Sequence, residues 1–428
     1  MRILDLVTVP VRGGFFVDDQ AAIRAGAVKD GFSYRGTPVT PGFAAIRQPA
    51  EALSVLLLLD DGSVAHGDCA VSQYSGVGGR DPVFGAAAAA RDIDAHLRPV
   101  LVGAELTSFR ELAQRVGDVR TPTGALHSAI RYGGTQALLD AVARRDRTTM
   151  AEVIAAEYDT GIELAPVPLF AQTGDEQYDN AEKMILKGVD VLPHGLINAI
   201  ATRLGARGEL LADYLGWLVR RIAELCPSVD YLPALHFDTY GTIGLAFDGD
   251  INAIAAYLTE LGNIAAPHQL TIEHPVDAGS TAAQLDTYEQ LTAALRRRGS
   301  AVRIAVDEWC NTYEDIQRFV DRRAADVIHV KTPDLGGIDR AVEALLLIRR
   351  AGLVAYCGGT CTETDRSAQV TAHLAMACGA GQVLAKPGMG VDEGLMIVGN
   401  EMARVMALVG RRRPAAGPVL LVPEGTPA

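Results

Sequence analysis

Four short apolar segments decide the fold of this chain: ALHFD (234–238), LTIEH (270–274), VRIAVDE (302–308) and VIHVK (327–331). The first three lead to a carboxylate and the fourth ends in an amine; the residues concerned are Asp238, Glu273, Asp307 and Lys331. They stand 35 (273 − 238), 34 (307 − 273) and 24 (331 − 307) positions apart, the length of a strand–helix unit in an α/β protein. Charged groups repeated at the ends of apolar strands are not typical of a packed core, and they indicate a site with a metal and a base.

The same rhythm continues on both sides of these segments. Four more complete a set of eight from Pro166 onward: VPLFAQ (167–172), VDVLPH (189–194), LVAYCGG (353–359) and QVLAKPG (382–388). Amphipathic segments such as GELLADYLGWLVRRIAEL (208–225) separate most of them. Eight alternating units over roughly 220 residues predict a (β/α)8 TIM barrel, whose usual size is about 250 residues. The alternative, a doubly wound open sheet, needs a phosphate-binding loop after its first strand, and the sequence has none there.

The first part of the chain lacks this rhythm. Three strand-like segments, at 3–11, 52–63 and 63–71, precede helical patterns, which predicts an antiparallel α+β unit. We therefore expect three parts: an α+β capping domain over residues 1–163, a TIM-barrel catalytic domain over 164–391, and a helix and tail over 392–428 that pack on the cap.

A glycine-rich loop, QYSGVGGRD (73–81), lies inside the predicted cap. It lacks the G-x-G-x-x-G order of a nucleotide-binding turn. Two interpretations stay open, a mobile surface loop and a lid that reaches over a neighbouring site.

The composition excludes several classes of function. The net charge of −13 argues against a nucleic-acid partner, which favours a basic surface. The six cysteines have no paired metal-ligand spacing, so we expect reduced thiols in a cytoplasmic protein. The most apolar run, residues 55–59, is too short to cross a membrane, and the N-terminus lacks the apolar core of a signal peptide.

In a TIM barrel the catalytic groups project from the carboxyl ends of the strands. In strand order these positions are Gln172, His194, Asp238, Glu273, Asp307, Lys331, Thr360 with Cys361, and Leu384. The three acids fall on consecutive strands, so their mutual repulsion calls for a cation, and oxygen ligands favour a hard ion such as Mg²⁺. His194 and Lys331 fall on opposite strands and flank that ion. By strand alternation Glu308 should face away from the site.

This layout predicts a particular chemistry. A proton next to a carboxylate is weakly acidic, because its loss adds a second negative charge, and a divalent ion stabilises that charge. A lysine near a metal and away from water has a lowered pKa and can act as the base. A leaving group on the adjacent carbon then departs, so we expect proton abstraction α to a carboxylate followed by β-elimination.

Motifs spread over nearly the whole chain resemble those of the methylaspartate ammonia-lyase family of the enolase superfamily. They are VSQYSGVGGRDP, PLFAQTGD, DVLPHGLIN, LHFDTYGTIG, IEHPVDAG, VDEWCNT, VKTPDLGGI, CGGTCTETD and AKPGMGVDEG. The resemblance implies a small amino-dicarboxylate substrate, (2S,3S)-3-methylaspartate, with mesaconate and ammonia as products. It also implies a homodimer, and it leaves open whether a monovalent cation such as K⁺ assists.

The resemblance also implies a role for each matching residue. Asp238, Glu273 and Asp307 would bind Mg²⁺. Lys331 would remove the C3 proton of the substrate, and His194 would act on the opposite face. The amino group and second carboxylate would be held by Gln73, Gln172, Thr360 and Cys361, with Leu384 on the carbon skeleton.

One position departs from the family pattern. His329 stands two residues before Lys331, where the resemblance implies a glutamine that contacts the metal-bound carboxylate. We expect His329 to bind substrate there and to alter substrate choice or pH dependence. It keeps open a second hypothesis, another enolase-type dehydratase or epimerase of a small carboxylate. A third hypothesis, from a different class, is a catalytically silent metal-binding scaffold.

Overall fold

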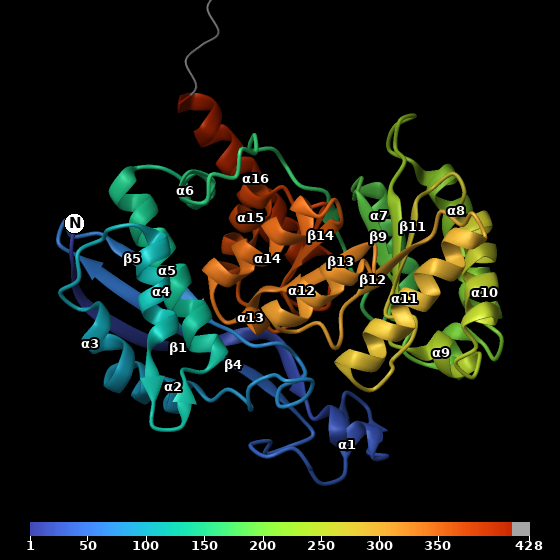
Figure 1. Cartoon of the computed structure of the whole chain (residues 1–428), viewed down its shortest axis with the longest axis horizontal. Coiled ribbons are helices and arrows are strands. Elements are labelled where there is room, and N and C mark those ends of the chain that lie inside the picture. Colours follow the sequence, from blue (N-terminus) through green and yellow to red (C-terminus); the bar gives the residue numbers. More distant parts are fainter. Residues whose placement is uncertain (413–428) are drawn as a thin grey trace, which may run out of the picture.

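The computed structural model describes residues 1–412, which form an N-terminal α+β domain beside a barrel (Figure 1). The predicted tail beyond Arg412 lies outside the described residues. Both parts of the predicted fold class, the TIM barrel and the α+β capping domain, are confirmed.

The N-terminal domain is built on a three-stranded antiparallel sheet in the order β1–β4–β5. Its strands are β1 (Ile3–Asp18), β4 (Arg47–Leu59) and β5 (Val64–Cys69), with the short pairs β2 (Val28–Asp30) and β3 (Ser33–Arg35), and β6 (Arg120–Thr121) and β7 (Gly124–Ala125). Its helices are α1 (Gln20–Arg24), α2 (Ala86–Asp92), η1 (Ile93–Leu97), α3 (Arg98–Leu101), α4 (Phe109–Asp118), α5 (Ser128–Asp146) and α6 (Met150–Glu157). Alternate residues of β4, namely Leu53, Val55 and Leu57, are fully buried, because successive side chains of a strand point to opposite faces.

Eight parallel strands close the barrel in the order β10–β11–β12–β13–β14–β15–β8–β9. They are β8 (Leu169–Phe170), β9 (Val191–His194), β10 (Ala234–Asp238), β11 (Leu270–Glu273), β12 (Arg303–Val306), β13 (Val327–Lys331), β14 (Val354–Gly358) and β15 (Gln382–Leu384). The helices after them are α7 (Gln177–Leu186), η2 (Ile200–Leu204), α8 (Glu209–Leu225), α9 (Thr242–Ala246), α10 (Ile251–Ala265), α11 (Thr281–Arg297), α12 (Tyr313–Arg322), α13 (Thr332–Leu335), α14 (Ile338–Arg350), α15 (Asp365–Cys378) and α16 (Asp392–Arg412).

A small apolar cluster fills the barrel interior. Its members come from six different strands: Phe170, Val191, Ala305, Val327, Tyr356 and Leu384. Side chains that fill a narrow barrel exclude water from its centre, so the polar residues at the strand ends are displayed at the rim.

Helix α5 joins the two domains near the site. It packs on β5 and β4 of the sheet and on α13, which directly follows Lys331. The hydroxyl of Tyr132 in α5 donates to Glu363 Oε1 at 2.7 Å and lies 3.1 Å from Thr332 Oγ1. The N-terminal domain therefore contacts the loops that carry the predicted catalytic residues.

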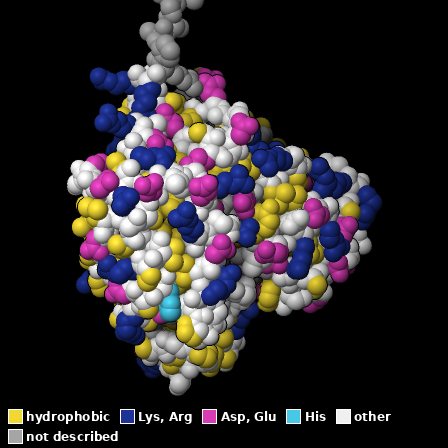
Figure 2. Space-filling model, turned by 60° about the vertical axis from the view of Figure 1, so that its left-hand side comes forward, with side chains coloured by type: hydrophobic (Ala, Val, Ile, Leu, Met, Phe, Trp, Pro, Cys, Tyr) yellow, Lys and Arg dark blue, Asp and Glu magenta, His cyan; other side chains and the backbone are white. Residues whose placement is uncertain are grey.

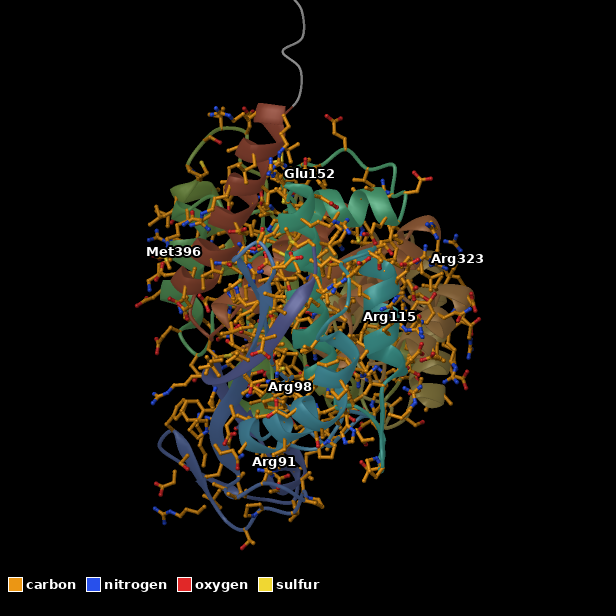
Figure 3. All side chains as sticks on the ribbon, turned by 90° about the vertical axis from the view of Figure 1, so that its left-hand side faces the viewer. Arg91, Arg98, Arg115, Glu152, Arg323 and Met396 are labelled. Atoms are coloured by element: carbon orange, nitrogen blue, oxygen red, sulfur yellow. The ribbon has the colours of Figure 1, made fainter. Side chains whose placement is uncertain are left out.

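Helix α16 returns along the barrel and packs on α15. At its start Asp392 pairs with Lys183 of α7 and with Lys187, which follows that helix, and at its end Arg412 pairs with Glu152 of α6. Figure 3 shows α16 at the edge of the molecule, with Met396 on its outer side and Glu152 near its far end.

The surface shows no single-sign field on the face drawn in Figure 2, where Lys and Arg side chains are interspersed with Asp and Glu. Among the helices of residues 1–412, none has both the length and the apolar character needed to traverse a bilayer.

The contact between α5 and the sheet gives a first prediction. A Cβ on Gly133 would lie 2.5 Å from the backbone nitrogen and 2.6 Å from Sγ of Cys69, so Gly133→Ala should overpack this contact and destabilise the protein by about 1–3 kcal/mol. Gly117→Ala in α4 is the matched control, because a Cβ there meets open space and should stabilise by about 0.5–1 kcal/mol. Thermal melts of both variants test this, and equal melting temperatures would contradict it.

Candidate active site

The parallel strands bring the predicted acids and lysine to one mouth of the barrel. Strands β10 to β13 are consecutive neighbours in the ring, and Asp238 lies directly across from Glu273 in the register of β10 and β11. Asp307 follows the last residue of β12, and Lys331 ends β13. His194 ends β9, four places from β13 in the ring of eight, so His194 and Lys331 lie on opposite sides of the mouth.

The acids form two overlapping groups, each with a histidine. One is His194, Asp238 and Glu273, and the other is Glu273, Asp307 and His329; in each group, one ligand atom per residue lies within 4.8 Å of the others. All five residues are buried.

The donor set of these groups fits a divalent cation. Glu273 Oε2 and Asp307 Oδ1 are buried; His236 Nε2 lies 2.9 Å from the first and Lys331 Nζ 2.8 Å from the second, but neither contact within the described residues has good hydrogen-bond geometry. Burial, together with the charges of Glu273 and Asp307, raises the pKa of Asp238 well above its usual value. A buried cation among these oxygens would relieve their mutual repulsion.

Two side chains in series, Gln382 and His236, position the carboxylate of Glu273. Gln382 Nε2 lies 2.9 Å from His236 Nδ1, and His236 Nε2 lies 2.9 Å from Glu273 Oε2. With its Nδ1 accepting from Gln382, His236 carries its proton on Nε2, toward the carboxylate. This leaves Oε1 of Glu273 facing the site.

Lys331 is charged in this arrangement. Its Nζ lies 2.8 Å from Asp307 and 3.2 Å from Glu308 Oε1. Burial acts to lower the pKa of Lys331, but the charges of Asp307 and Glu308 outweigh it and raise the pKa above its ordinary value. The prediction of a lowered pKa for Lys331 assumed a cation beside the lysine. With the carboxylates alone, the pKa of Lys331 is raised instead.

The prediction for Glu308 is wrong. β12 ends at Val306, so Asp307 and Glu308 lie on the following turn, where strand alternation does not apply. Glu308 consequently turns toward Lys331 rather than away from the site.

Arg80, which the sequence argument did not single out, pins the glycine-rich loop 73–81 to the barrel. Its Nη1 donates to Glu308 Oε2 at 3.0 Å and its Nε donates to Asp334 Oδ2 at 2.7 Å. Asn311 adds a further contact, because its Oδ1 accepts from Arg80 at 2.9 Å and its Nδ2 donates to Gly78 O at 2.8 Å. The loop therefore contacts the turn after β12 and helix α13, next to Lys331. Its interpretation as a lid stays a prediction. No local feature of the sequence marks Arg80, because its partners Asp334 and Glu308 lie 254 and 228 positions away in the chain.

Gln73 is oriented by an ion pair of the N-terminal domain. Its Nε2 donates to Asp18 Oδ2 at 3.1 Å, and Asp18 accepts two hydrogen bonds from Arg47, at 2.7 and 2.6 Å. A carboxylate only accepts, so the amide nitrogen of Gln73 must face Asp18. The amide oxygen then faces the site, where the Cys361 thiol donates to it at 3.5 Å.

The remaining predicted residues are buried around the mouth. Gln172 Oε1 and His194 Nδ1 have no hydrogen-bond partner within the described residues, which leaves them available to a ligand. Burial lowers the pKa of His194 to about 3, so its imidazole is neutral at physiological pH. Thr360 Oγ1 lies 2.6 Å from Thr362 Oγ1, and Leu384 packs in the interior cluster.

Two family models match the chain. The model described as "Methylaspartate ammonia-lyase N-terminus" matches residues 1–159, and "Methylaspartate ammonia-lyase C-terminus" matches residues 161–411. The methylaspartate ammonia-lyase of Clostridium tetanomorphum is 52% identical over 413 residues, which cover 96% of this chain and 100% of that protein. Methylaspartate ammonia-lyase 2 of Carboxydothermus hydrogenoformans is also 52% identical, over 96% of this chain and 99% of its own length.

Solved structures agree. The Mg complex of β-methylaspartase from C. tetanomorphum superposes with a TM-score of 0.93 over 96% of this chain and 100% of that one, at 52% identity. Methylaspartate ammonia lyase from Citrobacter amalonaticus, solved with (2S,3S)-3-methylaspartic acid, gives a TM-score of 0.93 at 46% identity, over 96% of this chain and 100% of its own. The muconate lactonizing enzyme of Pseudomonas putida, at 15% identity and a TM-score of 0.57, shares the fold.

The arginine contacts give a second prediction. Arg80→Met removes the cation between Glu308 and Asp334, and a buried pair that loses one partner costs about 3–5 kcal/mol. We expect a lower melting temperature and faster cleavage within residues 73–81 by a non-specific protease. Arg91→Met is the control, because Arg91 is exposed on α2 (Figure 3). A cleavage pattern shared by both variants would refute the pinning of the loop.

Proposed function

The chain belongs to the methylaspartate ammonia-lyase family, and from this premise we propose that it eliminates ammonia from (2S,3S)-3-methylaspartate to give mesaconate. One observation carries the proposal: Lys331 and His194 face each other across a mouth that gathers three buried carboxylates. The relative from C. amalonaticus, solved with this amino acid, supports the choice of substrate.

The carboxylates Asp238, Glu273 and Asp307 would hold Mg²⁺, as their oxygen donors and shared burial favour. When bound, the ion would stabilise the negative charge that develops on the substrate carboxylate. The magnesium complex of the C. tetanomorphum relative supports this assignment.

Lys331 would take the C3 proton at Nζ. The amine must be neutral to accept a proton, but the charges of Asp307 and Glu308 favour its protonated form. Arg80 offsets one of them, since its guanidinium pairs with Glu308 and its own positive charge acts against protonation of the lysine. Asp307 is the other, and its charge would be shared with the ion that it helps to hold. The lid arginine thus helps to make the base available.

The far wall would bind the rest of the substrate. The Gln73 oxygen, fixed by Asp18, is an acceptor for the substrate ammonium. Gln172, Thr360 and Cys361 would bind the second carboxylate, and Leu384 would pack on the methyl group. His194, neutral and on the opposite side from Lys331, would accept a proton from the other C3 epimer.

The placement of Lys331 and His194 on opposite sides of the mouth also favours a second candidate function, the epimerisation of a small carboxylate without loss of ammonia. Two proton-accepting groups on opposite faces of one carbon suit that reaction as well. Ammonia release separates the two candidates, because only the lyase reaction produces it.

The direct test incubates the purified protein with (2S,3S)-3-methylaspartate and follows mesaconate by its ultraviolet absorbance and ammonia by a coupled assay. We expect equal amounts of both products with Mg²⁺, loss of both after treatment with EDTA, and recovery when Mg²⁺ is returned. Absence of mesaconate across a range of pH and Mg²⁺ concentrations would sink the proposal.

Replacement of the base gives a further prediction. Lys331→Ala should lower the rate of mesaconate formation by a factor of about 10²–10⁴, the usual contribution of a positioned base. Lys183→Ala, an exposed lysine of α7, is the matched control and should keep wild-type activity. Exchange of the C3 hydrogen in D₂O should fall with the rate in Lys331→Ala; undiminished exchange would assign the proton transfer to another group.

A further inference from the structure

We propose that His329 Nδ1 is a direct ligand of the divalent cation, so that the site has mixed nitrogen and oxygen donors. This inference rests on the proposed function, because it takes a cation at the carboxylates as given. It goes beyond that function by adding a histidine to the donor set and by predicting which ions the site prefers.

The distances are those of a coordination sphere. His329 Nδ1 lies 3.2 Å from Glu273 Oε1 and 3.2 Å from Asp307 Oδ1. Two donor atoms at right angles around an ion, with bonds of about 2.1 Å, are separated by about 3 Å. The distance from Nδ1 to each of the two oxygens is therefore close to the distance between two ligands of one ion.

The imidazole ring is fixed by its surroundings. It stacks on Tyr356, with the ring centroids 3.8 Å apart and the planes 12° from parallel. Beyond its other edge lies Gly358, where a Cβ would come within 2.6 Å of His329 Nε2. Glycine at position 358 therefore leaves room for the ring in this position.

The ring has no other polar task. His329 is only 3% exposed, and its Nε2 has no hydrogen-bond partner within the described residues. Its polar contacts are with Glu273 and Asp307. Coordination through Nδ1 would place the ring proton on Nε2, and the two contacts of Nδ1 with candidate ligands point to the ion.

The other histidine group is less well placed. His194 Nε2 lies 3.7 Å from Asp238 Oδ2, half an ångström farther than the His329 contacts. Glu273 belongs to both groups, and His236 behind its Oε2 leaves Oε1 toward His329. The geometry thus favours His329 over His194 as the nitrogen donor.

A nitrogen donor changes which ions bind well. Imidazole suits Fe²⁺, Ni²⁺ and Zn²⁺, whereas Mg²⁺ favours oxygen ligands, and affinity for mixed sites rises along the first-row series from Mn²⁺ to Ni²⁺. The full-length protein should bind Mn²⁺ more tightly than Mg²⁺. In His329→Gln, which keeps a polar side chain of similar reach, the preference for Mn²⁺ over Mg²⁺ should fall by about tenfold or more.

The test uses the metal alone, without substrate. The full-length protein, stripped with EDTA and loaded with one equivalent of Mn²⁺, is studied by pulsed electron paramagnetic resonance, which detects nitrogen bound to the ion. We expect a ¹⁴N coupling in the wild type that changes to ¹⁵N when the histidines are ¹⁵N-labelled. His329→Gln should lose the coupling, and the matched variant His194→Gln should keep it.

Two results would overturn the inference. The first is a wild-type spectrum without nitrogen coupling, which needs no variant to fold. The second is a coupling that disappears in His194→Gln and survives in His329→Gln. The mesaconate assay with Mg²⁺, run on the same preparation, keeps the two proposals apart: activity without nitrogen coupling rejects the ligand role alone, and nitrogen coupling without mesaconate rejects the lyase reaction alone.

Discussion

Closure of the barrel forces three carboxylates into one small buried space, and most of the site can be understood as a response to their repulsion. The repulsion is evident at Asp238, where burial and the two acidic neighbours raise the pKa well above the usual value. The pKa values of Glu273 and Asp307 are lowered instead. Burial acts to raise the pKa of each, but nearby histidines and Lys331 outweigh that effect and keep both ionised. The protein thus keeps a concentrated negative charge where a cation can bind.

Charges that compensate one another extend from the carboxylates of the site to the glycine-rich loop. Asp307 pairs with Lys331, Lys331 with Glu308, and Glu308 with Arg80 of the loop 73–81. Each link is buried or nearly so, and in low dielectric such pairs interact strongly. The position of the loop and the charge of Lys331 are therefore coupled through Glu308, which links the N-terminal domain to the barrel.

The sequence was a good guide wherever a regular repeat controlled the outcome. The eight apolar segments became the eight barrel strands, and counting along them placed His194 opposite Lys331. It failed at Glu308, because β12 ends at Val306, before both Asp307 and Glu308, so alternation does not apply to them. It also missed Arg80, Asp18 and Arg47, since nothing local distinguishes an arginine or aspartate that forms a long-range pair from one on the surface.

By itself the sequence determined the architecture, the order of the acids and Lys331 along the strands, and the family motifs, because strand periodicity and residue type are local properties. Only the tertiary structure decided how these groups interact: which oxygen of Glu273 faces the mouth, how the amide of Gln73 is oriented, and that His329 contacts both Glu273 and Asp307. Such contacts join residues far apart in the chain. Their geometry depends on side chains from several strands and both domains, and pKa values depend on the same distances.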